Sequence, residues 1–169
     1  YRLNVVAKDI IGGTLNNYEM ALDVPHYDDE KLASSTIILA DVIEKVPTKS
    51  IGTGQFVIGT SKVRPRLNET FKREEKMGLY MQLYNFGPDE KTQKPNASID
   101  YEVVKNSNNQ KVFEFSEEVA KIDSASSNQT TVEKLLPLKG LEPGQDKVKI
   151  QVTDEKRNQK LTTSDPFKG

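Results

Sequence analysis

The chain has 169 residues, which is enough for one good-sized domain, or for one domain and part of another. Its 24 Lys and Arg residues balance 25 Asp and Glu residues, so the bulk charge gives no attraction to nucleic acid, and no apolar run reaches the roughly 18 residues that membrane insertion requires. Cysteine is absent and His26 is the only histidine, which excludes disulfides, cysteine chemistry and most acid–base designs that rely on imidazole.

The first 25 residues predict a β-hairpin. Two segments alternate apolar and polar residues with the period of a half-buried strand, and a polar turn separates them. The last 25 residues repeat this organisation. The corresponding positions are Leu3, Val5, Ala7 and Asp9 with Val148, Ile150, Val152 and Asp154. We therefore interpret residues 1–25 as the closing hairpin of an upstream β-sandwich whose front half is missing. Because an isolated hairpin is marginal in water, we expect it to dock on the second domain or to self-associate with another copy of the chain.

Residues 26–33 form a polar connector, and the segment after it is ambiguous. Over residues 31–46, Leu32, Leu39 and Val46 fit the stripe of an amphipathic helix. The β-branched Ile38 and Val42 favour a strand instead, since such residues pack well on a pleated surface. We favour a strand that opens a second domain at residues 34–169.

The rest of the chain consists of strand and turn patterns. Residues 49–67 predict one or two short strands, and Pro65 places them at a sheet edge. Residues 76–86 are the firmest strand, apolar on both faces, and residues 97–105 and 111–116 form a hairpin. A turn at Pro143 and Gly144 leads to the closing hairpin. About eight strands without alternating helices predict an all-β, immunoglobulin-like antiparallel β-sandwich.

The closing segment LPLKGLEPGQDKVKIQVTDEKRNQK resembles the last hairpin of many bacterial immunoglobulin-like modules. Together with YRLNVVAKD, LASSTIILAD, GQFVIGTSKVRP and GLYMQLYNFG, it makes the chain similar to the C-terminal region of exported bacterial proteins that carry a GWxTD domain. The GWxTD motif itself does not occur in this sequence. The resemblance implies an array of β-sandwiches in a periplasmic or extracellular location, and it supplies no catalytic residues.

One ligand site can be suggested from the aromatic residues. Tyr80, Tyr84 and Tyr101 could form a platform on which sugar rings stack, because tyrosine offers an apolar ring and a hydroxyl that stays in water. The alternative is that the three rings fill the core or cover the flank of a sheet, which requires no special assumption. We favour the alternative and keep carbohydrate binding as the second hypothesis.

Three other groups of residues have simpler interpretations. His26, Asp28, Asp29 and Glu30 could ligate a divalent cation, but the spacing matches no known loop and predicts a solvated connector. Asp9 and Asp154 are expected to cap turns through their side chains. The basic residues are expected to protect a sheet edge; they are Lys62, Arg64, Arg66, Lys72, Arg73 and Lys76.

The sequence thus predicts no catalytic residue, no cofactor and no metal site. It favours a non-catalytic spacer or protein-interaction module of a larger exported protein, with a protein or a polysaccharide of the envelope as its partner and without nucleic acid binding.

Overall fold

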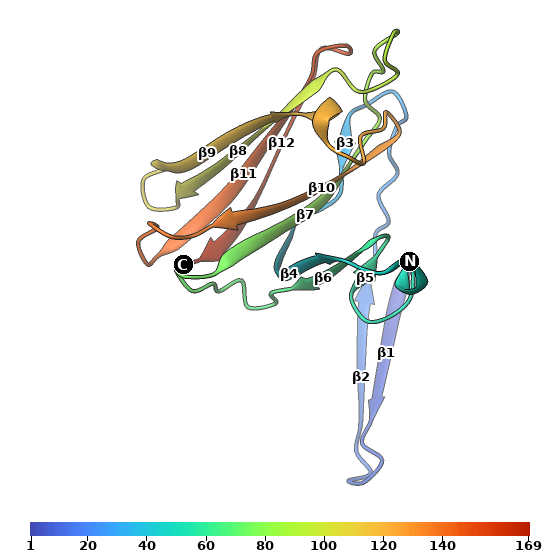
Figure 1. Cartoon of the computed structure of the whole chain (residues 1–169). Helices are drawn as coiled ribbons and strands as arrows, with labels where there is room; N and C mark the ends of the chain where they lie inside the picture. The colour runs from blue at the N-terminus through green and yellow to red at the C-terminus, as the bar shows by residue number, and fades with distance from the viewer.

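The computed structural model describes residues 1–169 and is built of β-strands, with two single 3₁₀ turns at Thr48–Ser50 and Val119–Lys121. A two-stranded hairpin, β1 (Arg2–Lys8) and β2 (Leu15–Ala21), projects from a sandwich of two antiparallel sheets (Figure 1). The all-β class expected from the alternating sequence is therefore confirmed. No helix in the chain is long and apolar enough to cross a membrane.

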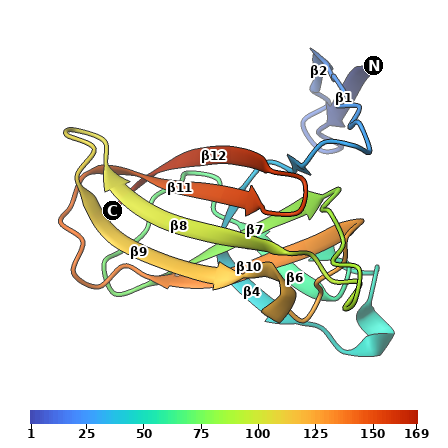
Figure 2. The same ribbon diagram turned by 90° about the horizontal axis from the view of Figure 1, so that it is seen from above.

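The first sheet has the strand order β10-β7-β4-β6-β5, and the short β3 pairs with β7 beyond the end of β4. The second sheet has the order β12-β11-β8-β9. The bounds of the first sheet are β3 (Ala33–Ser34), β4 (Ile38–Lys45), β5 (Val57–Ile58), β6 (Ser61–Pro65), β7 (Lys76–Tyr84) and β10 (Gln129–Pro137). Those of the second are β8 (Ala97–Lys105), β9 (Lys111–Glu118), β11 (Gln145–Asp154) and β12 (Gln159–Lys168). Figure 2 shows the two layers from above.

The core lies between the two sheets and follows the period of two along each central strand. Every second residue of β7, β8 and β11 points inward, and most of these side chains are fully buried. They include Met77, Leu79, Met81, Leu83, Ile99, Tyr101, Val103, Val148, Ile150 and Val152. Burial of each such side chain contributes about 1.5–3 kcal/mol, so these three strands supply a large share of the hydrophobic stabilisation of the sandwich.

The ambiguous segment after the connector is a strand, as favoured. β4 pairs with β7 through Ile38–Ala40 and with β6 through Ala40–Lys45, and its register shifts between Ala40 and Val42. This bulge places Asp41 outside the regular ladder. Gly78 of β7 leaves room for the side chain of Ile43 of β4. A Cβ on residue 78 would lie only 2.9 Å from Ile43 Cδ1.

The hairpin packs against no part of the sandwich. All residues from Tyr1 to Lys31 are exposed, so docking on the second domain, one of the two modes expected, does not occur. The connector is nevertheless fastened from Tyr27 onward. The Asn85 side-chain amide donates to the carbonyls of Asp28 and Lys31, and Arg157 donates to that of Asp29. Only residues 22–26 link the hairpin to these anchored residues.

Candidate interaction surface

The hairpin has one apolar and one polar face. Leu3 lies opposite Met20 and Val5 opposite Tyr18, so their side chains share a face. The same face includes Tyr1 and Leu22, whose backbones are bonded to each other. The exposed fractions are large for apolar residues: 91% for Tyr1, 48% for Val5 and 61% for Tyr18. An apolar face of this kind is typical of a surface that contacts another protein.

The opposite face of the hairpin is mainly polar, and Val6 and Leu15 are the exposed apolar side chains on it. Arg2 forms an ion pair with Glu19, with 3.0 Å between Nη1 and Oε1. Asn4 lies opposite Glu19, and Asn17 lies opposite Val6. The two-sidedness of the hairpin therefore matches that of a strand pair whose one face is buried and whose other face meets water.

The outer edge of β1 is unpaired. Tyr1 and Leu22 exchange backbone hydrogen bonds, and the Asp9 amide donates to the Thr14 carbonyl, which identifies the odd-numbered residues of β1 as those bonded to β2. The backbone groups of Arg2, Asn4, Val6 and Lys8 therefore point away from β2 and are free to pair with another strand. A free edge next to an apolar face can accept both a strand and a covering sheet.

The turn of this hairpin is capped as predicted. Asp9 Oδ1 accepts a hydrogen bond of 2.9 Å from the Ile11 amide. The backbone bonds from Gly12 and Ile11 hold the pKa of the Asp9 carboxyl below its usual value, because they favour the charged form. Asp154 caps its own turn in the same way, with bonds to Oδ1 from the amides of Lys156 and Arg157 at 3.0 and 3.1 Å.

The three candidate tyrosines do not share one exposed face. Tyr101 points into the core, is 1% exposed, and donates from its hydroxyl to Glu117 Oε1 at 2.6 Å. Tyr80 points to the opposite side of its own sheet and is 4% exposed. Only Tyr84 is half-buried, and its ring stacks on that of Tyr27 with 5.3 Å between the centroids. A platform built from all three rings is therefore not present.

The acidic connector does not gather its side chains around one point. Asp28 Oδ1 accepts from the Glu30 amide at 3.0 Å, and Oδ2 lies 3.5 Å from Lys31 Nζ. No three histidine, cysteine or acidic side chains of the chain come close enough together to hold a metal ion. His26 therefore belongs to no group of three side chains that could hold a metal ion.

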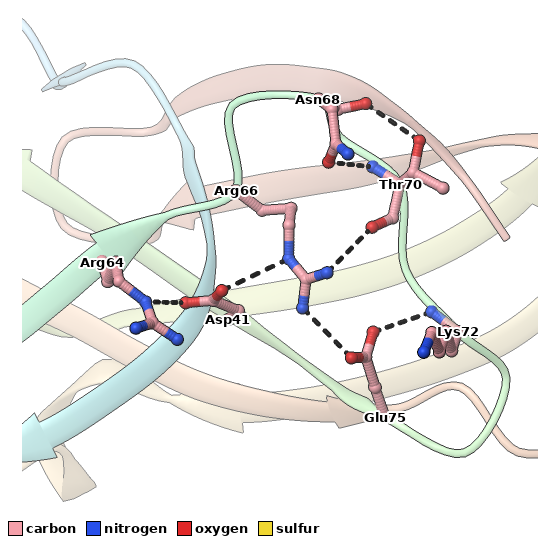
Figure 3. A network of polar contacts seen from close by, with 7 residues as sticks. All are labelled: Asp41, Arg64, Arg66, Asn68, Thr70, Lys72 and Glu75. Carbon is pink, nitrogen blue, oxygen red and sulfur yellow. Dashed lines mark hydrogen bonds and ion pairs between the residues drawn. The ribbon is translucent and has the colours of Figure 1, made fainter.

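Arg64 near the end of β6 and Arg66 just after the strand pair with acidic partners (Figure 3). Arg64 Nε donates to Asp41 Oδ1 at 2.6 Å, and Arg66 lies 3.5 Å from Asp41 Oδ2 and 3.2 Å from Glu75 Oε1. The Lys72 amide and then Arg66 hold the pKa of Glu75 below its usual value. The charges of Arg64 and Arg66 are therefore compensated by carboxylates. The outer side of Arg64 and Pro65 lacks a paired strand, as expected of a sheet edge.

A polar groove on the outer face of the first sheet was not foreseen from the sequence. It has a volume of about 520 Å³ and runs between the β5–β6 turn and the segment after β9. Glu133 bridges Lys45 and Ser61 there, at 2.8 and 2.6 Å, and the Gln82 side chain bonds to the hydroxyls of Tyr80 and Tyr84. These groups satisfy one another. Lys45, Ser61 and Glu133 come from distant parts of the sequence, so no local signal could have revealed the groove.

No family model matches the sequence, and a search of curated proteins found no similar chain. Among solved structures, the chain is similar to the Pseudomonas fluorescens alkylpurine DNA glycosylase AlkC bound to DNA containing an abasic site analog, with 18% sequence identity and a TM-score of 0.36. The match covers 59% of this chain and 27% of that chain. This chain thus spans less than a third of the length of the glycosylase.

Proposed function

We propose that the chain is a non-catalytic β-sandwich module that serves as a spacer or protein-interaction unit in a larger exported bacterial protein, and that its contact is made through the β1–β2 hairpin. The observation that carries this proposal is the unpartnered apolar face of the hairpin, on which Tyr1, Val5 and Tyr18 are about half exposed or more. Full burial of such a side chain is worth about 1.5–3 kcal/mol, so a covering partner gains several such contributions at once.

The strand order supports an immunoglobulin-like assignment within the sandwich class. In that fold, strands A, B and E lie in one sheet and strands C, F and G in the other. Here β4, β7 and β10 are neighbours in the first sheet and correspond to strands A, B and E. In the second sheet, β8, β11 and β12 are neighbours and correspond to strands C, F and G. β9 extends the second sheet next to β8, as strand C′ does in variable-type domains. Modules of this kind commonly occur in multi-domain surface proteins, which agrees with the proposed exported location.

The proposal can be tested with a photo-reactive amino acid at one position at a time in the natural full-length protein, in its own cells. In place of Val5, on the apolar face, we expect a cross-link to protein after irradiation. Asn4 provides the matched control, because it is the next residue of the same strand and lies on the polar face. Equal cross-linking at both positions, or none at Val5, would contradict the proposal.

A further inference from the structure

We propose that β1–β2 is the closing hairpin of a second β-sandwich, built like the one at residues 34–169 and formed by an upstream segment of the same polypeptide. This inference rests on the proposed function and names the partner of the hairpin. The hairpin β11–β12 shows the surroundings that such a hairpin has when its sandwich is complete.

The two hairpins have the same turn. Four residues separate the last paired positions in each, at 10–13 between Asp9 and Thr14 and at 155–158 between Asp154 and Gln159. In both, the aspartate before the turn accepts from the amide two residues later. The last turn residue is left-handed in both, with φ of 71° at Gly13 and 52° at Asn158. Equal length, cap and backbone twist indicate one hairpin design used twice.

The apolar sides of the first strands of the two hairpins, β1 and β11, also correspond. Leu3, Val5 and Ala7 match Val148, Ile150 and Val152, which are all 0% exposed because the opposite sheet covers them. The β1 residues have the same pattern without the cover. The polar faces agree as well: Asn4 matches Lys149, which faces outward and is partly exposed. The face left open on β1–β2 is thus the one that a facing sheet buries on β11–β12.

The free edge of β1 corresponds to an edge of β11 that is occupied. β8 pairs with β11 along its whole length, from Asp146 opposite Lys105 to Asp154 opposite Ala97. We therefore infer that a strand equivalent to β8 pairs with the free backbone groups of Arg2, Asn4, Val6 and Lys8 in the upstream sandwich. Pairing at this edge continues the sheet by the same antiparallel ladder.

Asp154 makes one contact that Asp9 lacks. Its Oδ2 accepts a hydrogen bond of 2.7 Å from the Gly87 amide, in the loop that joins β7 to β8, and so ties the hairpin to the body of the sandwich. Asp9 is an exposed residue, and its hydrogen bond to the Ile11 amide lies within the hairpin. We expect the Asp9 carboxylate to accept an amide from the equivalent loop of the upstream sandwich.

A second copy of the chain is a weaker occupant. Two hairpins packed face to face would bury about six apolar side chains on each copy and would leave both β1 edges unpaired. Stable protein interfaces involve about 20–30 residues on each side. Insertion into an open sandwich buries the apolar face and satisfies the edge of the same strand, which removes both exposed features.

Hydrogen exchange of the backbone amides tests this inference. In the 169-residue chain, we expect the amides of Arg2, Asn4, Val6 and Lys8 to exchange freely, because nothing pairs with them. In the full-length protein, they should exchange about a hundredfold more slowly or more, as amides in a stable central ladder do. Unchanged exchange in the full-length protein overturns the inference, as does a natural polypeptide without an upstream sandwich.

A variant and the cross-linked product separate this inference from the proposed function. Val5→Asp places a charge at the centre of the expected interface and should lower the unfolding midpoint of the upstream domain, while that of residues 34–169 stays the same. Asn4→Asp adds the same charge on the polar face and should change neither. A Val5 cross-link to residues upstream of Tyr1 supports the inference. A cross-link to a different polypeptide would overturn the upstream sandwich and leave the proposed interaction module intact. Dimers of the 169-residue chain with protected β1 amides would do the same. The absence of any cross-link to protein would overturn both the upstream sandwich and the interaction module.

Discussion

Glu117 of β9 and Lys134 of β10 form an ion pair of 2.6 Å that joins the two sheets of the sandwich. Both strands lie at the edges of their sheets, and the side chains are only 14% and 28% exposed. Tyr101 donates its hydroxyl to the other oxygen of Glu117 at 2.6 Å. Burial and then the bond to Glu117 raise the pKa of Tyr101, so its hydroxyl keeps its proton throughout the ordinary pH range. The three side chains close the open side of the sandwich with polar contacts.

Lys134→Met is expected to destabilise the sandwich, because it leaves the Glu117 carboxylate partly buried with only the Tyr101 hydroxyl as a donor. The expected loss is about 1–3 kcal/mol in the free energy of unfolding, measured by urea denaturation. The double variant Glu117→Gln with Lys134→Met removes both charges and should recover part of the loss. An unchanged urea midpoint for the single variant would show that water already screens the pair.

Asp154→Ala is expected to be more damaging than the same change at Asp9. The Asp154 carboxylate is fully buried and accepts three backbone amides, from Gly87, Lys156 and Arg157, which the variant leaves without a partner. The buried Gly87 amide accounts for about 1–3 kcal/mol, and the two turn amides, which water can reach, add less, so we expect a loss of about 2–4 kcal/mol in the free energy of unfolding. Asp9→Ala removes an equivalent cap in the exposed hairpin and should leave the melting temperature of the sandwich unchanged. Equal effects would contradict this assignment.

The strands predicted well are those whose side chains alternate without interruption. β8 and β11 alternate buried and half-buried residues over nearly their full length, so the local pattern was sufficient to define them. The alternation of β8 puts Tyr101 on the same face as Ile99 and Val103, which the structure shows to be buried, so periodicity is a better guide to its position than its chemical suitability for sugar stacking. The aspartate caps were also predictable, since they depend on local backbone geometry alone.

The features that the sequence did not reveal depend on contacts between distant residues. The sequence pattern does not define β10 (Gln129–Pro137), because the charged Lys134 occupies an inward position and breaks the apolar alternation. Its partner Glu117 lies on another strand, so no local signal marks the pair. The position of Asp41 between two arginines likewise arises from a bulge in β4, which has no signature in a single sequence.

Arg66→Lys is expected to lower the free energy of unfolding by about 1–2 kcal/mol, even though it keeps the positive charge. Arg66 contacts Asp41, Glu75 and the Thr70 carbonyl from different guanidinium nitrogens, and the group lies 5.0 Å from the centre of the Phe71 ring. A lysine can satisfy only part of this set, because its ammonium is a single compact donor. The measurement is the free energy of unfolding in guanidinium chloride.

Arg64→Lys is the matched control for Arg66. Arg64 contacts Asp41 alone, and its side chain is 49% exposed. Such a surface pair contributes about 0–1 kcal/mol, so its replacement by lysine should change the unfolding midpoint very little. A loss at Arg64 as large as that at Arg66 would show that charge, and not the geometry of the contacts in Figure 3, holds this loop.

Asp146 is expected to make the stability of the sandwich depend on pH in a defined direction. Its side chain lies at the start of β11 and is 3% exposed, and burial raises the pKa of its carboxyl while the charge of Lys105 offsets part of the effect. The folded state therefore binds the proton more tightly than the unfolded state does. The stability that this tighter proton binding gives to the folded state is fully present below the unfolded pKa of about 3.9. It is lost as the pH rises through the pKa of the folded state. At neutral pH the charged carboxylate of Asp146 therefore lowers the free energy of unfolding.

Asp146→Asn should consequently raise the melting temperature at pH 7 and have little effect at pH 3, where the native carboxyl is already protonated. Thermal unfolding of both proteins at pH 3, 5 and 7 measures the difference. Asp23→Asn makes the same change of charge in an exposed residue outside the sandwich and should leave the melting temperature unchanged at all three pH values. A lower melting temperature for Asp146→Asn at pH 7 would mean that the charged carboxylate stabilises the end of β11, because then its interaction with Lys105 outweighs the cost of its burial.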